Sequence, residues 1–335
     1  MKILISGAAG FIGSNLAKGL LDLGHSVIGL DNLSQGSLLN IEEIKDYSGF
    51  YFVEGDVRDV DKVNQAMQGC DQVIHLAAYK IPRYSDALDT LLINSMGTKT
   101  VLDCAVNNKV KKVLIASTSD VYGKNPSVPF SEDSDLVIGR PEVKRWSYAI
   151  SKMFEEQLVF GYQERYGIHA VALRFFGGYG PNQHLSWWGG PQSVFINAAF
   201  DNEPITLHGD GTQTRSFTYI DDHVGGIIAC VEKDEANNQV FNLGATFEIS
   251  IKDLGFKIWN MIRPGEDPKI SYVPYESFGK YEDVLRRVPN IDKAHALLGF
   301  EPKTGLDEGL AKTIQWQVQR RRRLGIRTQE ISKRQ

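Results

Sequence analysis

Short apolar runs alternate with amphipathic segments along the first half of the chain. The runs that have strand length are residues 2–6, 26–31, 50–54, 71–76, 112–116 and 169–173. The segments with apolar residues at helical spacing are residues 14–21, 88–107 and 147–166. Continuous apolar runs are typical of parallel strands buried on both faces. The alternation therefore predicts an α/β fold, a Rossmann-type doubly wound parallel sheet with ligands at the carboxyl ends of its strands.

The alternation of strand-like and helical segments ends after Arg174, where loops rich in Gly, Pro and Trp begin. A further strand-like run, Gln239–Leu243, follows later and is expected to join the same sheet. We expect a smaller, discontinuous α/β substrate domain. The predicted larger domain comprises residues 1–174 and about 218–248; the smaller comprises about 175–217 and 249–318. Residues 319–335 are expected to form a basic tail, whose run Arg320–Arg323 is typical of a solvated helix end.

Composition narrows the possible functions. The 335 residues are 42% apolar and 23% charged with a net charge of -4, which argues against partners such as nucleic acid or an anionic membrane. No apolar run reaches the ~18 residues of a membrane span. The chain starts directly with a strand, so a cytoplasmic protein is expected. Three scattered cysteines and seven unclustered histidines indicate no metal site.

A glycine-rich turn follows the first strand. Gly7, Gly10 and Gly13 lie between an apolar run and a helical segment, an order that places free N–H groups and a helix N-terminus where a pyrophosphate could bind. The next strand ends in Asp31, 18 residues after Gly13. An acid at that place can accept both ribose hydroxyls and repels a 2′-phosphate. These features predict a dinucleotide site that prefers NAD to NADP.

Tyr148 and Lys152 are four residues apart in a predicted helix. They should therefore lie on one face, one turn apart. A phenol titrates near pH ~10, and a neighbouring cation favours its phenolate. The spacing thus predicts a tyrosine whose pKa is lowered by Lys152, although the same pattern also occurs where a half-buried Tyr stands beside a solvated Lys.

Four features together resemble the extended short-chain dehydrogenase/reductase family, over residues 1 to about 315. They are the Gly7-x-x-Gly10-x-x-Gly13 turn, Asp31, the strand-end Ser117-Thr118, and Tyr148-x-x-x-Lys152. The family comprises nucleotide-sugar epimerases, dehydratases and decarboxylases. Other stretches similar to it are residues 75–78, 121–123, 174–176, 209–217 and 287–291.

The resemblance implies a role for each matching position. Tyr148 would take the proton from the sugar's 4-hydroxyl, Lys152 would hold the nicotinamide ribose, and Thr118 would bind the same hydroxyl. A tightly bound NAD would be recycled within each cycle. Positions that resemble the family's cofactor contacts are Gly7, Gly10, Phe11, Ile12, Gly13, Asp31, Asn32, Asp56, Val57, Leu76, Ala77, Ala78, Lys80, Asn94, Ser117, Tyr148 and Lys152.

The resemblance makes Thr118, Ser119 and Asp120 candidate catalytic residues, among which the acid would transfer the proton at C5 after oxidation at C4. In dehydratases the last position of this triplet, or the last two, is acidic. Plain 4-epimerases usually have a small neutral residue there, and the triplet of UDP-uronate decarboxylases is similar to Thr-Ser-Glu. Asp120 is one methylene shorter than that glutamate. A structural alternative is that Asp120 caps the following turn.

The resemblance further implies a UDP-sugar substrate bound by Arg174, Gly177, Gln192, His208, Arg215 and Arg287. At Gly177 the family usually has an Asn that contacts substrate. This difference and the tryptophans at 187–188 lead us to expect an altered sugar pocket. The alternative is that the tryptophans only fill the interdomain core. Stretches around Arg145 and Lys280 favour UDP-uronate decarboxylation. The alternatives are 4-epimerisation, dehydration, or a non-catalytic NAD-binding regulator. Relatives pair helices 88–107 and 147–166 of two subunits, which predicts a homodimer.

Overall fold

The computed structural model describes residues 1–80 and 86–326. Its centre is a seven-stranded parallel sheet in the order β11-β6-β5-β4-β1-β2-β3. The strands are β1 (Lys2–Ser6), β2 (Ser26–Asp31), β3 (Phe50–Glu54), β4 (Gln72–His75), β5 (Lys112–Thr118), β6 (His169–Phe175) and β11 (Gln239–Leu243). The predicted doubly wound sheet is confirmed. Its order reverses between β1 and β4, the place where such sheets bind ligands.

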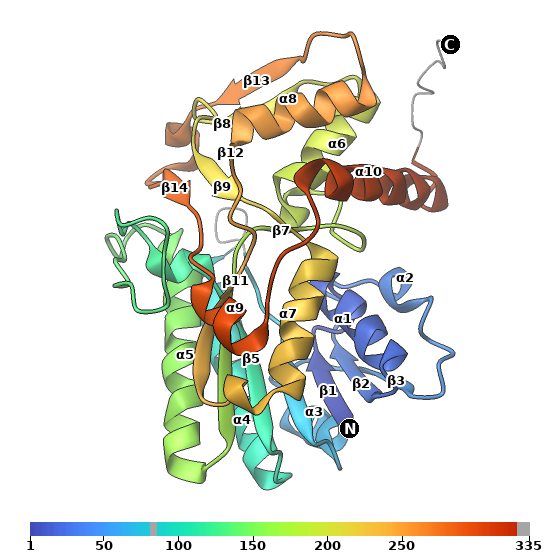
Figure 1. Cartoon of the computed structure of the whole chain (residues 1–335), viewed down its shortest axis with the longest axis vertical. Helices are drawn as coiled ribbons and strands as arrows, with labels where there is room; N and C mark the ends of the chain where they lie inside the picture. The colour runs from blue at the N-terminus through green and yellow to red at the C-terminus, as the bar shows by residue number, and fades with distance from the viewer. Residues whose placement is uncertain (81–85, 327–335) are drawn as a thin grey trace.

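Helices cover both faces of this sheet (Figure 1). One face carries α1 (Phe11–Asp22) and α7 (Ile220–Glu232), which pack together. The other carries α3 (Val60–Met67), α4 (Ala87–Asn107) and α5 (Trp146–Tyr166). Each face has its own buried core, in which the strand residues alternate between the two sets of helices. The short α2 (Leu38–Ile41) follows β2.

A second group of elements lies beyond the carboxyl ends of the central strands (Figure 1). Its main helices are α6 (Pro191–Asp201) and α8 (Ile251–Ile262). Its strands, with the pair that joins it to the sheet, are β7 (Gly178–Tyr179), β8 (Ile205–His208), β9 (Thr214–Ser216), β10 (Thr218–Tyr219), β12 (Glu248–Ser250), β13 (Ile270–Val273) and β14 (Arg286–Arg287). Four 3-10 turns are η1 (Ser119–Tyr122), η2 (Trp187–Gly189), η3 (Asp234–Ala236) and η4 (Tyr275–Phe278).

The segment that follows β14 returns to the central sheet, which differs from the expected boundary. Helix α9 (Asp292–Leu298) packs against β11 and α7 rather than within the smaller group. Apolar packing accounts for the position of α9, because Ala294, Leu298 and Phe300 are buried in the core beside α7.

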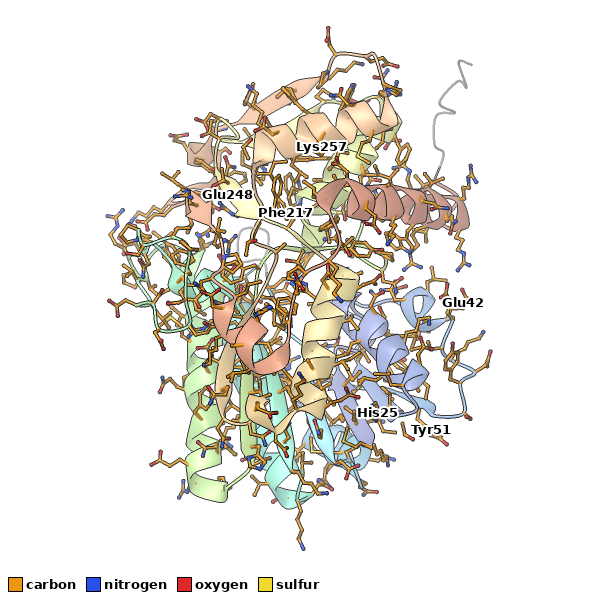
Figure 2. All side chains as sticks on the ribbon, in the orientation of Figure 1. His25, Glu42, Tyr51, Phe217, Glu248 and Lys257 are labelled. Carbon is orange, nitrogen blue, oxygen red and sulfur yellow. The ribbon has the colours of Figure 1, made fainter. Side chains whose placement is uncertain are left out.

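Helix α10 (Leu306–Arg323) also corrects an expectation. Residues 319–323 are helical, and only Arg322 and Arg323 of the basic run are exposed. Arg321, 2% exposed, donates to Asp201 Oδ2 on α6 at 3.1 Å, and Arg323 pairs with Glu42, labelled in Figure 2, at 3.0 Å. The run therefore ties α10 to α6 and to the start of the chain, instead of ending in solvent. Residues 327–335 of the expected tail lie outside the described residues.

Over the described part of the chain, no helix combines the length and apolar character needed to cross a membrane.

Candidate active site

The glycine turn between β1 and α1 leaves no room for side chains. Gly7 has a φ of 75°, and a Cβ there would lie 2.9 Å from the backbone nitrogen of Ala77. At Gly13 a Cβ would lie 2.1 Å from the Gly7 oxygen. Glycine is required because the turn, the helix and the end of β4 approach backbone to backbone. Phe11 and Ile12 form the first turn of α1, whose N-terminus faces this tight loop.

Asp31 ends β2 beside that turn. Its Oδ2 accepts from the Ala9 N–H at 2.9 Å and its Oδ1 from the Leu33 N–H at 2.8 Å. Burial raises the pKa of Asp31, although both N–H groups oppose the rise. The carboxylate is thus fixed across the glycine turn, where it could accept ribose hydroxyls. The turn and the acid together fit an adenosine diphosphate moiety such as that of NAD.

The remaining predicted cofactor contacts follow other strand ends. Asn32 donates to Asp56 Oδ2 at 3.0 Å after β3, next to Val57. Leu76, Ala77 and Ala78 follow β4, and Lys80 is the last residue before 81–85, which lie outside the described residues. On α4, Asn94 donates to Ser151 Oγ at 2.9 Å, and Ser117 Oγ lies 2.5 Å from Glu156 Oε1.

Tyr148 and Lys152 share one face of α5, as predicted, with Lys152 Nζ 6.0 Å from the centre of the Tyr148 ring. The surroundings of Tyr148 act against the expected lowering of its pKa. Burial raises the pKa of Tyr148, the charges of Asp120 and Glu155 raise it further, and Arg287 opposes them. The main physical reason is the burial of the phenol, and Lys152, the cation expected to lower this pKa, is paired with Glu155, whose Oε2 lies 2.9 Å from Nζ.

The triplet at the end of β5 turns into η1. Thr118 Oγ1 accepts a hydrogen bond from the Asp120 N–H at 3.2 Å, so Thr118 caps this turn. The structural alternative gave that role to Asp120. Ser119 is 4% exposed. The Asp120 carboxylate points instead to arginines: Arg287 contacts its Oδ1, and Arg145 Nη2 lies 3.1 Å from the same atom.

These residues belong to an arginine cluster, defined here as Arg145, Arg215, Arg287, Asp120 and Asp283. Arg145 Nη1 and Arg215 Nη2 lie 3.4 and 3.2 Å from Asp283 Oδ1. Burial would raise the pKa of Asp120, but Arg287, Arg145 and Arg215 hold it below its usual value. The pKa of Asp283 is likewise lowered by Arg215 and Arg145 against burial. Both carboxylates are therefore ionised at neutral pH.

Sequence reasoning missed three members of this site. Arg145 and Asp283 lie in stretches noted only for their resemblance, and their partners are up to 138 residues away in the chain. Glu155 by its residue type alone indicates no role, because an acid on a helix is normally exposed. An acid three residues after Lys152 on a helix otherwise facing the core was the available clue.

Two predicted substrate residues are engaged elsewhere. Arg174 is 5% exposed, and its Nε and Nη2 donate to Glu156 at 2.9 and 2.8 Å. Its geometry fixes α5 to the sheet rather than offering donors to a ligand. A Cβ at Gly177 would lie 2.7 Å from the Ser216 oxygen, near Phe217, which Figure 2 labels where the two groups of elements meet. The backbone of the following strands occupies the space that an asparagine would need.

The other predicted substrate residues lie at the base of the smaller group. Gln192, 1% exposed, is in the first turn of α6 and its Nε2 has no hydrogen-bond partner among the described residues. His208 stacks on Trp187 with ring centres 4.6 Å apart. Trp188 packs against Tyr79 at 5.3 Å. The two tryptophans thus connect the smaller group with the end of β4. Within residues 1–80 and 86–326, no group of metal-ligating side chains is arranged to hold an ion.

Comparison with known proteins places this site in a family. Residues 4–313 match the family model described as GDP-mannose 4,6 dehydratase. A UDP-N-acetyl-alpha-D-glucosaminuronate decarboxylase of Bacillus cytotoxicus is 35% identical, over 94% of this chain and 97% of that protein. Among solved structures, UDP-glucuronic acid 4-epimerase from Bacillus cereus, in complex with UDP-glucuronic acid and NAD, is 31% identical with a TM-score of 0.85, covering 95% and 99% of the two chains.

The dTDP-glucose 4,6-dehydratase DesIV from Streptomyces venezuelae, solved with NAD bound, is 28% identical with a TM-score of 0.87, covering 96% of this chain and 98% of that one. The three similar proteins thus carry three different activities on one fold. The chain belongs to the GDP-mannose 4,6 dehydratase family, the extended short-chain dehydrogenase/reductases that act as nucleotide-sugar epimerases, dehydratases and decarboxylases.

Proposed function

We propose that the protein is an NAD-dependent UDP-uronate decarboxylase that works through a 4-keto sugar. The observation that carries the proposal is the arginine cluster beside Tyr148. Three guanidinium groups face two ionised carboxylates, which leaves one positive charge in a site of which no side chain is more than 28% exposed. Such a site suits one further carboxylate, because a guanidinium binds carboxylates with paired donors.

The NAD site proposed is the glycine turn, with Asp31 at the adenosine ribose and Lys152 at the nicotinamide ribose. When bound, NAD supplies reversible hydride acceptance from C4 of the sugar. Tyr148 removes the proton of the 4-hydroxyl, and Thr118 donates to or accepts from the same oxygen. Oxidation at C4 turns the C6 carboxylate into that of a β-keto acid, which loses carbon dioxide and leaves an enolate. A proton from solvent at C5, and return of the hydride and of the Tyr148 proton to C4 and its oxygen, would then give the pentose and restore the starting state.

The charge balance of the arginine cluster suits this step. A carboxylate that leaves as carbon dioxide gives up its charge, so binding it too strongly would stabilise the ground state. Asp120 and Asp283 offset two of the three guanidinium charges. The cluster can therefore orient C6 while the developing negative charge moves to the C4 oxygen, near Tyr148.

Dehydration is less well supported. It needs both a base at C5 and a protonated acid to release the C6 oxygen as water, and Arg287 and Arg145 lower the pKa of Asp120, which suits this carboxylate only to the first of these roles. We therefore propose that Asp120 positions these two arginines. The 4-epimerase activity remains a second candidate, because a solved structure 31% identical to this chain is a UDP-glucuronic acid 4-epimerase, whose substrate also has a carboxylate.

Product analysis tests the proposal. Purified protein would be incubated with UDP-glucuronate, UDP-N-acetylglucosaminuronate and UDP-glucose without added reductant, and followed by NMR. We expect a UDP-pentose or its 2-acetamido counterpart and released carbon dioxide from a uronate. A product of unchanged mass with inverted C4 would replace decarboxylation by epimerisation. Conversion of UDP-glucose alone would remove the role given to the arginine cluster.

We also propose that the protein is a homodimer. The outer faces of α4 and α5 carry exposed apolar side chains at helical spacing: Leu88, Leu92, Met96, Ile150 and Phe154, each 40 to 60% exposed. An apolar stripe on two adjacent helices is suited to pairing with its own copy in a four-helix bundle.

A further inference from the structure

A buried ion pair lies within α5, close to Tyr148. Lys152 Nζ is 2.9 Å from Glu155 Oε2, and both side chains are 1% exposed. Taking a carboxylate and an ammonium out of water costs several kcal/mol for each ion, and only a close partner offsets this cost. The 2.9 Å contact therefore offsets part of the cost of burying both groups.

The surroundings of Glu155 provide little else to keep it charged. From α4, the Thr98 hydroxyl lies beside the carboxylate and also 2.9 Å from His75 Nε2 on β4. His75 is neutral, because burial and then Lys152 lower its pKa to about 3. On α5 itself, Glu156 is already paired with Arg174 at 2.8 Å. Tyr148 is an uncharged phenol. Within the described part of the chain, Lys152 is therefore the cation that faces Glu155, and it opposes the rise that burial causes in the Glu155 pKa.

We propose that Glu155 is a positioning residue that holds Lys152 until NAD binds, then releases it and takes up a proton. The inference rests on the NAD site of the proposed function but not on decarboxylation. The ammonium would turn from Glu155 to the ribose hydroxyls, and the carboxylate left behind would be a buried acid without a cation. One proton moves from solvent to Glu155, and no bond other than hydrogen bonds changes.

This exchange links NAD affinity to pH. Burial raises the pKa of Glu155, and Lys152 opposes the rise. When Lys152 leaves, the opposing contribution is lost, so the complex binds more protons than the free protein. Affinity for NAD must then increase as pH falls, by up to ~10-fold per pH unit between the two pKa values. The same exchange frees the Lys152 charge to stabilise the Tyr148 phenolate only once the cofactor is present.

Calorimetry of NAD binding tests the inference without turnover. Heats measured from pH 6 to 8 in buffers of different ionisation enthalpy give the protons taken up for each NAD bound. We expect uptake approaching about one proton in the wild-type protein. Uptake should vanish in Glu155→Gln and in Lys152→Met, and persist in the matched control Glu164→Gln, an exposed acid on the same helix.

The outcomes separate the two proposals. NAD binding without proton uptake by the wild-type protein would overturn the inference and leave the proposed function standing. Uptake that persists in a folded Glu155→Gln protein would assign the proton to another group and overturn it as well. Failure of the wild-type protein to bind NAD would overturn both. The wild-type measurement decides even where a variant does not fold.

Discussion

Arg145 is the residue that would contact the carboxylate of the proposed substrate. It is 12% exposed and joins the two acids of the arginine cluster, since its guanidinium reaches both Asp120 and Asp283. Its Nη1 also lies 2.9 Å from the Tyr281 hydroxyl. A side chain held in this way presents its donors in a fixed orientation, which is what recognition of a planar carboxylate requires.

We expect Arg145→Met to weaken binding of a UDP-uronate about 10- to 100-fold, because a hydrogen bond to a charged group is worth roughly 1.5–3 kcal/mol. Binding of UDP alone should change little. Calorimetric titration with both ligands checks this. The matched control is Arg140→Met, which removes an arginine that is 69% exposed five residues earlier. Equal losses for UDP and UDP-uronate would count against a carboxylate contact.

The lowered pKa values of Asp120 and Asp283 also predict how stability depends on pH. A carboxyl whose pKa is depressed by folding stabilises the protein above its unfolded pKa of ~3.9, and this contribution is lost as the pH falls through the folded value. The free energy of unfolding should therefore drop below about pH 4. In Asp120→Asn, urea titrations at pH 5 and 3 should differ less than in the wild type; an unchanged difference would contradict the assignment.

At the scale of elements, glycine determines how α10 docks. Gly309 lies over Tyr179, and a Cβ there would come within 2.1 Å of the Tyr179 hydroxyl oxygen. Tyr179 is fully buried and cannot move aside. We expect Gly309→Ala to cost about 1–3 kcal/mol of stability through overpacking.

Helix α7 offers the control for that substitution. Gly225 is exposed, and no atom lies within 4 Å of a Cβ added there. Gly225→Ala should leave stability unchanged or raise it by up to ~1 kcal/mol, since alanine favours helix. Urea unfolding of both variants compares them. Equal effects would show that contact with Tyr179 does not limit the docking of α10.

Much of the fold could be predicted because it rests on local patterns. Buried parallel strands give continuous apolar runs, so β1, β2, β3 and β11 have the bounds expected from sequence. The shared face of Tyr148 and Lys152 follows from helix geometry alone. Charge pairing could not be predicted in the same way. Arg287 meets Asp120 across 167 residues, and neither side chain carries a local sign of its partner.

At the scale of the whole molecule, the exposed apolar side chains of α4 and α5 bear on assembly. If it is the dimer interface proposed above, Phe154→Asp should yield monomers, because a charge would be buried at the centre of the contact. Analytical ultracentrifugation at micromolar concentration measures the outcome. The control is Tyr51→Asp, since Tyr51 is 61% exposed on β3, at the opposite edge of the sheet (Figure 2). A wild-type monomer would refute the interface itself.

The ties made by α10 have a consequence for how the chain reaches its final form. Arg323 and Arg320 contact Glu42 and Asn40, partners about 280 residues earlier. Contacts between such distant segments carry a large loop-closure cost and form late. We expect refolding to proceed from the central sheet outward, with α10 amides protected last in pulsed hydrogen exchange; early protection would contradict this. During synthesis, the first βα units would lack their contacts with α10 until the end of the chain is made. The nascent chain would therefore be exposed to misassembly until translation is nearly complete.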